Sequence, residues 1–172
     1  MTWIAMACLM FSSALAQLLL PTVSVLGQAK WPFLLAVVLY YALRREYRVM
    51  LAAALVAGLL QDGLGHTPLG FSVLMFLAVG LTVSGFKSIV LTDTLVTAVI
   101  FGISLSFVAT LVGGWTLRAT GLAGGGFAGL LVKALGGAFL GGLCVSIVFP
   151  VADAIDRMAG NVKRKDDIHG YE

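Results

Sequence analysis

The sequence predicts an all-α integral membrane protein with six transmembrane helices. Of its residues, 60% are hydrophobic and 11% are charged, whereas soluble domains carry about 25% charged residues. The mean hydropathy is +1.03. The 172 residues divide into six apolar stretches with short connections, and a membrane-spanning helix needs about 20 residues. The net charge of +3 is scattered along the chain, so no basic patch indicates nucleic-acid binding.

The six stretches are bounded by residues that interrupt a helix. Pro21 follows the first stretch and Pro150 follows the sixth, and proline disfavours helix continuation because it lacks a backbone N–H. The predicted helices cover residues 3–20, 31–43, 49–60, 69–86, 95–117 and 127–149. The chain thus divides into a transmembrane domain, residues 1–150, and a polar tail, residues 151–172.

The second and third helices are short, with 12 to 13 purely apolar residues each. A helix of that length covers about 20 Å of a hydrocarbon core about 30 Å thick, so a shallow hairpin is the alternative to two crossings. The turn between them carries Arg44, Arg45 and Arg48. These arginines must reach water, since each costs at least about 2.5 kcal/mol at mid-membrane. We therefore favour two crossings.

The placement of lysine and arginine predicts the orientation. With six spans, one side carries eight positive side chains: Arg44, Arg45, Arg48, Lys87, Arg157, Lys163, Arg164 and Lys165. The other side carries Lys30 and Arg118, and Lys133 lies within the sixth helix. Cytoplasmic loops are enriched in positive residues, so both termini are predicted to be cytoplasmic and the turn after the third helix external.

An acidic residue, Asp62, lies at the external end of the third helix. Ala54 and Gly58 precede it at intervals of four, so the three residues form one stripe on the helix. Glycine and proline follow in the turn, at Gly63, Gly65, Pro68 and Gly70. Asp62 either ends the helix in interfacial water or anchors the turn, by accepting backbone N–H bonds near residues 65–69 or by pairing with Lys133.

The sixth helix is rich in glycine. Gly137 and Gly141 form a small-xxx-small pair, which lets two helix backbones approach closely in lipid. We expect this pair to pack against another helix of the bundle, with a contact between subunits as the alternative. Lys133, near the external end of this helix, either extends its amino group outward or pairs with Asp62.

The sequence offers no catalytic constellation. His66 lies in the external turn and His169 in the cytoplasmic tail, on opposite sides of the membrane. Cys8 and Cys144 lie inside apolar runs without metal-ligand spacing. We therefore predict a protein that is not an enzyme and uses no cofactor or metal.

The order of features from residue 30 to residue 74 resembles the MreD family of rod shape-determining membrane proteins. Members have a proline-containing start to the second helix, here Lys30-Trp31-Pro32, then a short helix and a basic turn. A pattern like Gly-x-x-x-Asp-x-x-Ser-x-x-x-Leu-Gly follows. The matching positions are Gly58, Asp62, Leu69 and Gly70, whereas Gly65 stands where serine is expected.

The resemblance implies a non-enzymatic scaffold in the bacterial cytoplasmic membrane, surrounded by membrane lipid. Family members associate with MreC, and through it with MreB filaments, the glycan polymerase RodA and a class B penicillin-binding protein. This assembly guides lateral peptidoglycan synthesis during cell elongation. The family's fold also resembles the six-helix substrate-binding subunits of vitamin transporters.

A substrate-binding subunit of a vitamin transporter is therefore the alternative function. It requires a polar pocket that opens outward. The sequence places only the polar cluster of residues 62–67, with Lys133, on that side, which is little for a vitamin site.

The orientation gives the first testable prediction. A reporter fused after Glu172 should be active only when the reporter functions in the cytoplasm, because the positive residues concentrate on that side. Activity of a periplasm-specific reporter at the same position would contradict the orientation.

Overall fold

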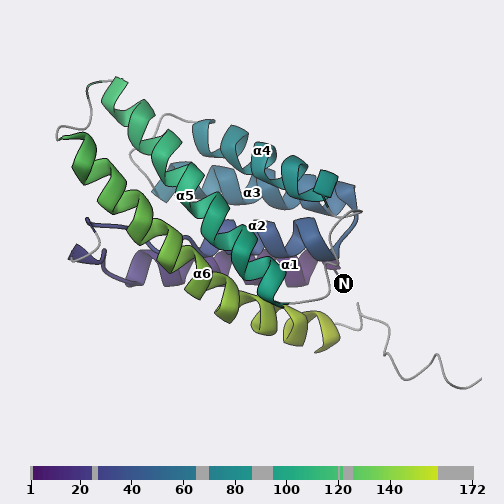
Figure 1. Ribbon diagram of the computed structural model, residues 1–172. Helices are drawn as coiled ribbons and strands as arrows, with labels where there is room; N and C mark the ends of the chain where they lie inside the picture. The colour runs from purple at the N-terminus through teal and green to yellow at the C-terminus, as the bar shows by residue number, and fades with distance from the viewer. Residues whose placement is uncertain are drawn as a thin grey trace, which may run out of the picture.

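The computed structural model describes residues 2–24, 27–64, 70–86, 95–119, 121 and 126–158, and these form a bundle of α-helices (Figure 1). In chain order the helices are α1 (Thr2–Leu19), α2 (Phe33–Arg44), α3 (Tyr47–Leu64), α4 (Phe71–Phe86), α5 (Leu95–Ala119) and α6 (Phe127–Met158). The all-helical prediction is confirmed for the described residues. Figure 1 shows α5 and α6 as a long pair that crosses the other helices obliquely.

Helix α2 is the centre of the bundle. It contacts each of the other five helices, and no residue from Phe33 to Leu43 is more than 9% exposed. Its sequence, FLLAVVLYYALR, has no polar face, and a helix that is apolar all round is stable where it is covered on every side. The core of the protein is therefore built around α2.

Helix α5 packs mainly against α6, through small residues on both helices. A Cβ added at Gly137 would lie 2.6 Å from Thr110 Oγ1, and one at Gly141 would lie 2.8 Å from the Gly102 carbonyl oxygen and collide with Ser106. Gly137 and Gly141 thus lie at the contact between the two helices. Neither position has room for a side chain.

Helices α3 and α4 form a second antiparallel pair. A Cβ at Gly58 would collide with the backbone of Val73, and one at Gly80 would lie 2.6 Å from the Met50 sulfur. Ala54, between Met50 and Gly58 on the same stripe, is fully buried. The stripe of small residues that leads to Asp62 therefore lies under α4.

The sequence predicts that the sixth helix ends at Pro150, and the structure shows that this prediction is wrong. Helix α6 continues through Pro150 for a total of 32 residues, or about 48 Å at 1.5 Å per residue. Proline removes one helical hydrogen bond, but Ala152 and Asp156 beyond it are both 1% exposed. Tertiary contacts thus hold the extension in place, and residues 151–158 of the expected tail are helical.

Three of the described helices, α3, α5 and α6, are long and apolar enough to cross a membrane. The others, α1 counted from Trp3, α2 and α4, are apolar but shorter. Membrane insertion follows from the three long helices, whereas the count of six spans stays a prediction.

The packing of α5 on α6 gives a matched pair of substitutions. Gly141→Leu should lower the melting temperature of the purified protein or prevent its accumulation, because overpacking costs about 1–3 kcal/mol. Gly129→Leu, on the same helix but with open space where a Cβ would project, should be tolerated. Equal stability of the two variants, measured by thermal unfolding in detergent, would contradict this account.

Candidate functional site

Asp62 joins the end of α3 to the start of α4. Its carboxylate is nearly buried, with the residue 4% exposed. Oδ2 accepts a hydrogen bond from the Gly70 backbone N–H at 2.6 Å, and Oδ1 accepts one from Ser72 at 3.0 Å. The first N–H groups of a helix have no partner within the helix and form its positive end. The Asp62 carboxyl group therefore caps the beginning of α4.

The sequence predicts that Asp62 accepts backbone N–H bonds near residues 65–69 or pairs with Lys133. The observed donors are Gly70 and Ser72, while residues 65–69, with His66, Pro68 and Leu69, lie outside the described residues. Gly70 has a φ of +95°, a conformation that glycine adopts readily. No ion pair joins Asp62 to Lys133 within the described part of the chain.

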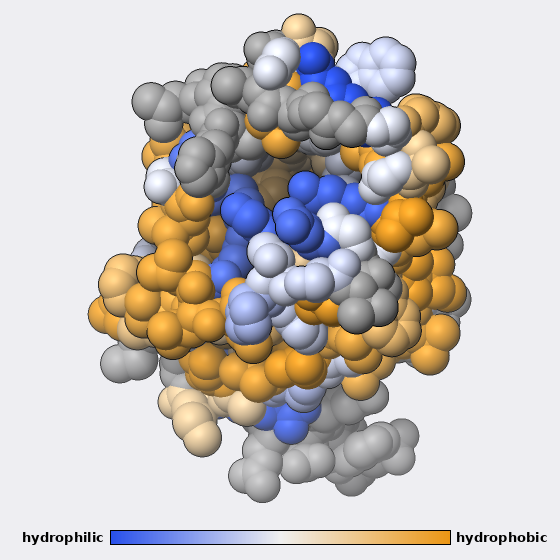
Figure 2. Space-filling view, turned by 90° about the vertical axis from the view of Figure 1, so that its left-hand side faces the viewer, coloured by the Kyte–Doolittle hydropathy of each residue, from blue (hydrophilic) through white to orange (hydrophobic). Residues whose placement is uncertain are grey.

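A cavity of about 360 Å³ opens at the same end of the bundle. Figure 2 looks onto this end, where hydrophilic residues line a hollow that apolar surface surrounds. All six helices, or the segments next to them, contribute to its lining. Its floor is the beginning of α2, with Pro32 and Leu35. The central helix thus begins at this cavity.

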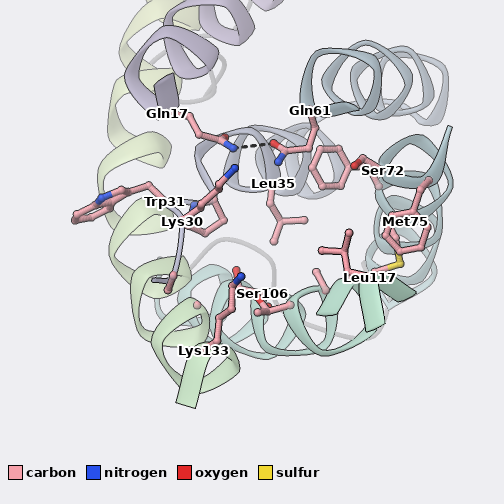
Figure 3. A pocket seen from close by; sticks show the side chains of 18 residues that line it. Gln17, Lys30, Trp31, Leu35, Gln61, Ser72, Met75, Ser106, Leu117 and Lys133 are labelled. Atoms are coloured by element: carbon pink, nitrogen blue, oxygen red, sulfur yellow. Dashed lines mark hydrogen bonds between the residues drawn. The ribbon is translucent and has the colours of Figure 1, made fainter. Parts of the chain in front are cut away.

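Two lysines and two glutamines line the cavity. Lys30, just before α2, and Lys133, on α6, extend into it from different sides (Figure 3). Gln17 of α1 donates a hydrogen bond to Gln61 Oε1 of α3 at 2.8 Å across one edge. The cavity thus combines positive charge, amide groups and an apolar floor. Sequence reasoning had placed Lys133 near this end but had not joined it with Lys30, Gln17 and Gln61.

The segment before α2 sets the position of Lys30. Val23 and Ala29 form an isolated antiparallel bridge, and Gly27 has a φ of +65°. A Cβ at Gly27 would lie 3.0 Å from the backbone nitrogen of Lys133, so this segment rests on α6. The contact brings Lys30 and Lys133, which are distant in sequence, to one cavity.

A buried ionic cluster occupies the opposite end of α2. The Arg45 guanidinium lies 2.7 Å from Asp156 Oδ2, and the Tyr40 hydroxyl lies 2.9 Å from both Asp153 Oδ1 and Asp156 Oδ2. Arg44 is 3.7 Å from Asp153 in a more exposed pair. Asp156 is only 1% exposed, and a buried carboxylate needs such partners. The cluster ties the end of α2 to the extension of α6.

Sequence reasoning missed this cluster because it ended the sixth helix at Pro150 and sent the arginines to water. The segment after Pro150 contains a pattern that could have predicted a longer helix. Asp153 and Asp156 are three residues apart, so they share a helix face, and the apolar residues Val151, Ala152 and Ile155 continue beside them. That pattern is typical of a helix that is packed on one side.

The remaining cysteine and acidic side chains of the described residues can also be placed. Within the described residues no group of three or more His, Cys, Asp or Glu side chains could hold a metal ion. Cys8 is exposed and Cys144 buried, and both are free thiols. The acidic side chains Asp62, Asp153 and Asp156 are engaged in a helix cap and in ion pairs.

The fold and these sites define a helical membrane protein whose polar groups serve helix capping, ion pairing and a cavity. A family profile described as rod shape-determining protein MreD matches residues 1–120, which is more than half of the chain. The chain belongs to the MreD family of rod shape-determining proteins. Searches of curated proteins and of solved structures gave no match. The prediction from residues 30–74 is thus confirmed at the level of the family.

The two arginines of the ionic cluster offer a direct comparison. Arg45→Met should destabilise the protein strongly, by up to about 3–5 kcal/mol, because it leaves the buried Asp156 carboxylate without its counter-ion. Arg44→Met removes a longer and more exposed pair and should cost about 1 kcal/mol or less. Thermal unfolding of both variants in the same detergent measures the difference, and equal melting temperatures would contradict the assignment.

The cap made by Asp62 predicts that two substitutions at this position reduce function to different extents. Asp62→Asn keeps the shape and one acceptor oxygen, so it should retain much of the rod-shape function. Asp62→Leu should fail, because each backbone N–H left unsatisfied costs about 1–3 kcal/mol. Complementation of a rod-shaped bacterium without its own MreD, with membrane levels of each variant measured, tests this. Equal loss of function at normal levels would instead favour a role in proton transfer.

Proposed function

We propose that this protein is a non-enzymatic membrane scaffold of the cell-elongation complex, and that it binds MreC and helps organise lateral peptidoglycan synthesis. The observation that carries the proposal is the MreD profile match over residues 1–120. That match includes α1 to α5 and both residues of the Gly58–Asp62 motif. MreB, RodA and a class B penicillin-binding protein are the proposed members of the same assembly.

The distribution of charge supports an orientation for this scaffold. Arg44, Arg45 and Arg48 lie at one end of the bundle, together with Arg157 near the end of α6. We assign this end to the cytoplasm, following the preference of positive residues for that side. Both termini then lie in the cytoplasm of a multi-pass protein in the inner membrane. The cavity and the Asp62 cap face the periplasm.

The bundle offers apolar surface for lipid or for a partner's transmembrane helix. On α6 every fourth residue is an exposed apolar side chain: Leu131, Leu135, Phe139, Leu143 and Ile147. Residues at this spacing form one ridge along the helix. The α3–α4 connection, which Asp62 anchors, is the external element that we propose helps to present the surface for MreC.

Co-purification tests the scaffold. A tagged copy of this chain, extracted in mild detergent from cells that lack their own MreD, should retain MreC and restore rod shape. Rod shape without retention of MreC would count against MreC as the partner. A bound vitamin or an energising ATPase in the purified complex would overturn the scaffold and favour a transporter subunit.

A further inference from the structure

We infer that the cavity between Lys30 and Lys133 binds a phosphate group carried on an apolar molecule. This inference goes beyond the proposed scaffold role, because a scaffold requires no ligand. It rests on the charge of the cavity, on polar groups without partners around it, and on the uncapped beginning of α2 at its floor.

The described lining of the cavity holds positive charge and no acidic side chain. Lys30 and Lys133 both line it, and none of the described residues that line it is Asp or Glu. Asp62 lies beside Gln61 in sequence, but its carboxylate is directed to the N–H groups of Gly70 and Ser72. Two ammonium groups facing one space repel each other, and an anion between them removes that repulsion.

Two buried polar atoms in the cavity lining have no hydrogen-bond partner among the described residues, namely the Ser106 hydroxyl and Gln17 Oε1. Ser106, which lines it, is 2% exposed, and its hydroxyl has no hydrogen-bond partner among the described residues. Gln61 accepts from Gln17 with Oε1, which leaves its amide nitrogen available as a donor. A buried polar group without a partner costs about 1–3 kcal/mol. An oxyanion would give the Ser106 hydroxyl and the Gln61 amide nitrogen an acceptor, whereas Gln17 Oε1 requires a donor from the rest of the bound molecule.

The floor of the cavity adds a helix N-terminus. No side chain caps the beginning of α2, and its first N–H groups follow Pro32, which lines the cavity. The helix has 12 residues, and its positive end favours a negatively charged group. At α4 the carboxylate of Asp62 fills this role, whereas at α2 no described side chain does so.

The remaining wall is apolar. Leu35, Phe71, Met75, Phe76 and Leu117 line it, so a fully hydrated ion such as free phosphate would leave this surface uncovered. The volume of about 360 Å³ falls within the range of small-molecule sites. A phosphate next to an acyl or aromatic group would match both halves of the cavity, and either a phospholipid or a soluble phosphate ester has this chemistry.

Binding can be measured on the purified full-length protein in a neutral detergent. Dioctanoyl phosphatidic acid, dioctanoyl phosphatidylcholine, phenyl phosphate and inorganic phosphate are titrated separately, with a thermal shift and calorimetry as readouts. We expect saturable binding of phosphatidic acid or phenyl phosphate, and much weaker binding of phosphatidylcholine and inorganic phosphate. Phosphatidic acid alone indicates a lipid source, and phenyl phosphate with equal affinity indicates a soluble one.

Two variants and a control locate the site. Lys30→Gln and Lys133→Gln should each weaken binding about ten- to hundredfold, the range for a hydrogen bond to a charged group. Arg48→Gln removes the same charge from an exposed position at the opposite end of the bundle and should leave affinity unchanged. Ala109→Phe, which places a ring in the cavity without altering charge, should also reduce binding.

The proposal is overturned if none of the phosphate compounds binds saturably. It is equally overturned if Lys30→Gln, Lys133→Gln and Arg48→Gln all lower the affinity to the same extent. That result would show that the ligand is attracted only by the net charge of the protein. Neither result bears on MreC binding, so the scaffold proposal is tested separately. A melting temperature for each variant without ligand shows that the affinity is measured on folded protein.

Discussion

The structure depends on enclosing a short, wholly apolar helix. Helix α2 has 12 residues, about 18 Å of length, against a hydrocarbon core of about 30 Å. Five helices surround it, so it is buried along its whole length. Each end therefore presents helix termini and polar residues inside the bundle, and the rest of the protein has to accommodate them.

The two ends meet this requirement differently. At the C-terminal end, Arg45 is paired with Asp156 from α6, and Tyr40 adds a hydroxyl to the same carboxylates. At the N-terminal end the surrounding helices leave a cavity with two lysines. At one end of α2 the charged groups are thus paired with each other inside the protein, whereas at the other end two lysines line a cavity.

Much of this fold could be predicted from the sequence, because helix type and approximate bounds follow from hydropathy and from breakers. The family could be predicted as well, since Gly58, Asp62 and Gly70 lie in a local pattern. The extension of α6 could not, because tertiary contacts of Ala152 and Asp156 override the local effect of Pro150. The cavity was missed for a related reason. Lys30, Lys133, Gln17 and Gln61 come from four distant segments, and only tertiary contacts such as those of Gly27 with Lys133 and of Gln17 with Gln61 bring them together.

Helix α6 has a mechanical consequence. It carries Lys133 at the cavity and Asp156 in the ionic cluster, and about 35 Å of continuous helix separates them. Both positions are fixed to the surroundings of α2, one through Gly27 and the other through Arg45. A rod held at two points cannot tilt at one of them without straining the contact at the other. The cavity lining and the ionic cluster therefore share one mechanical element.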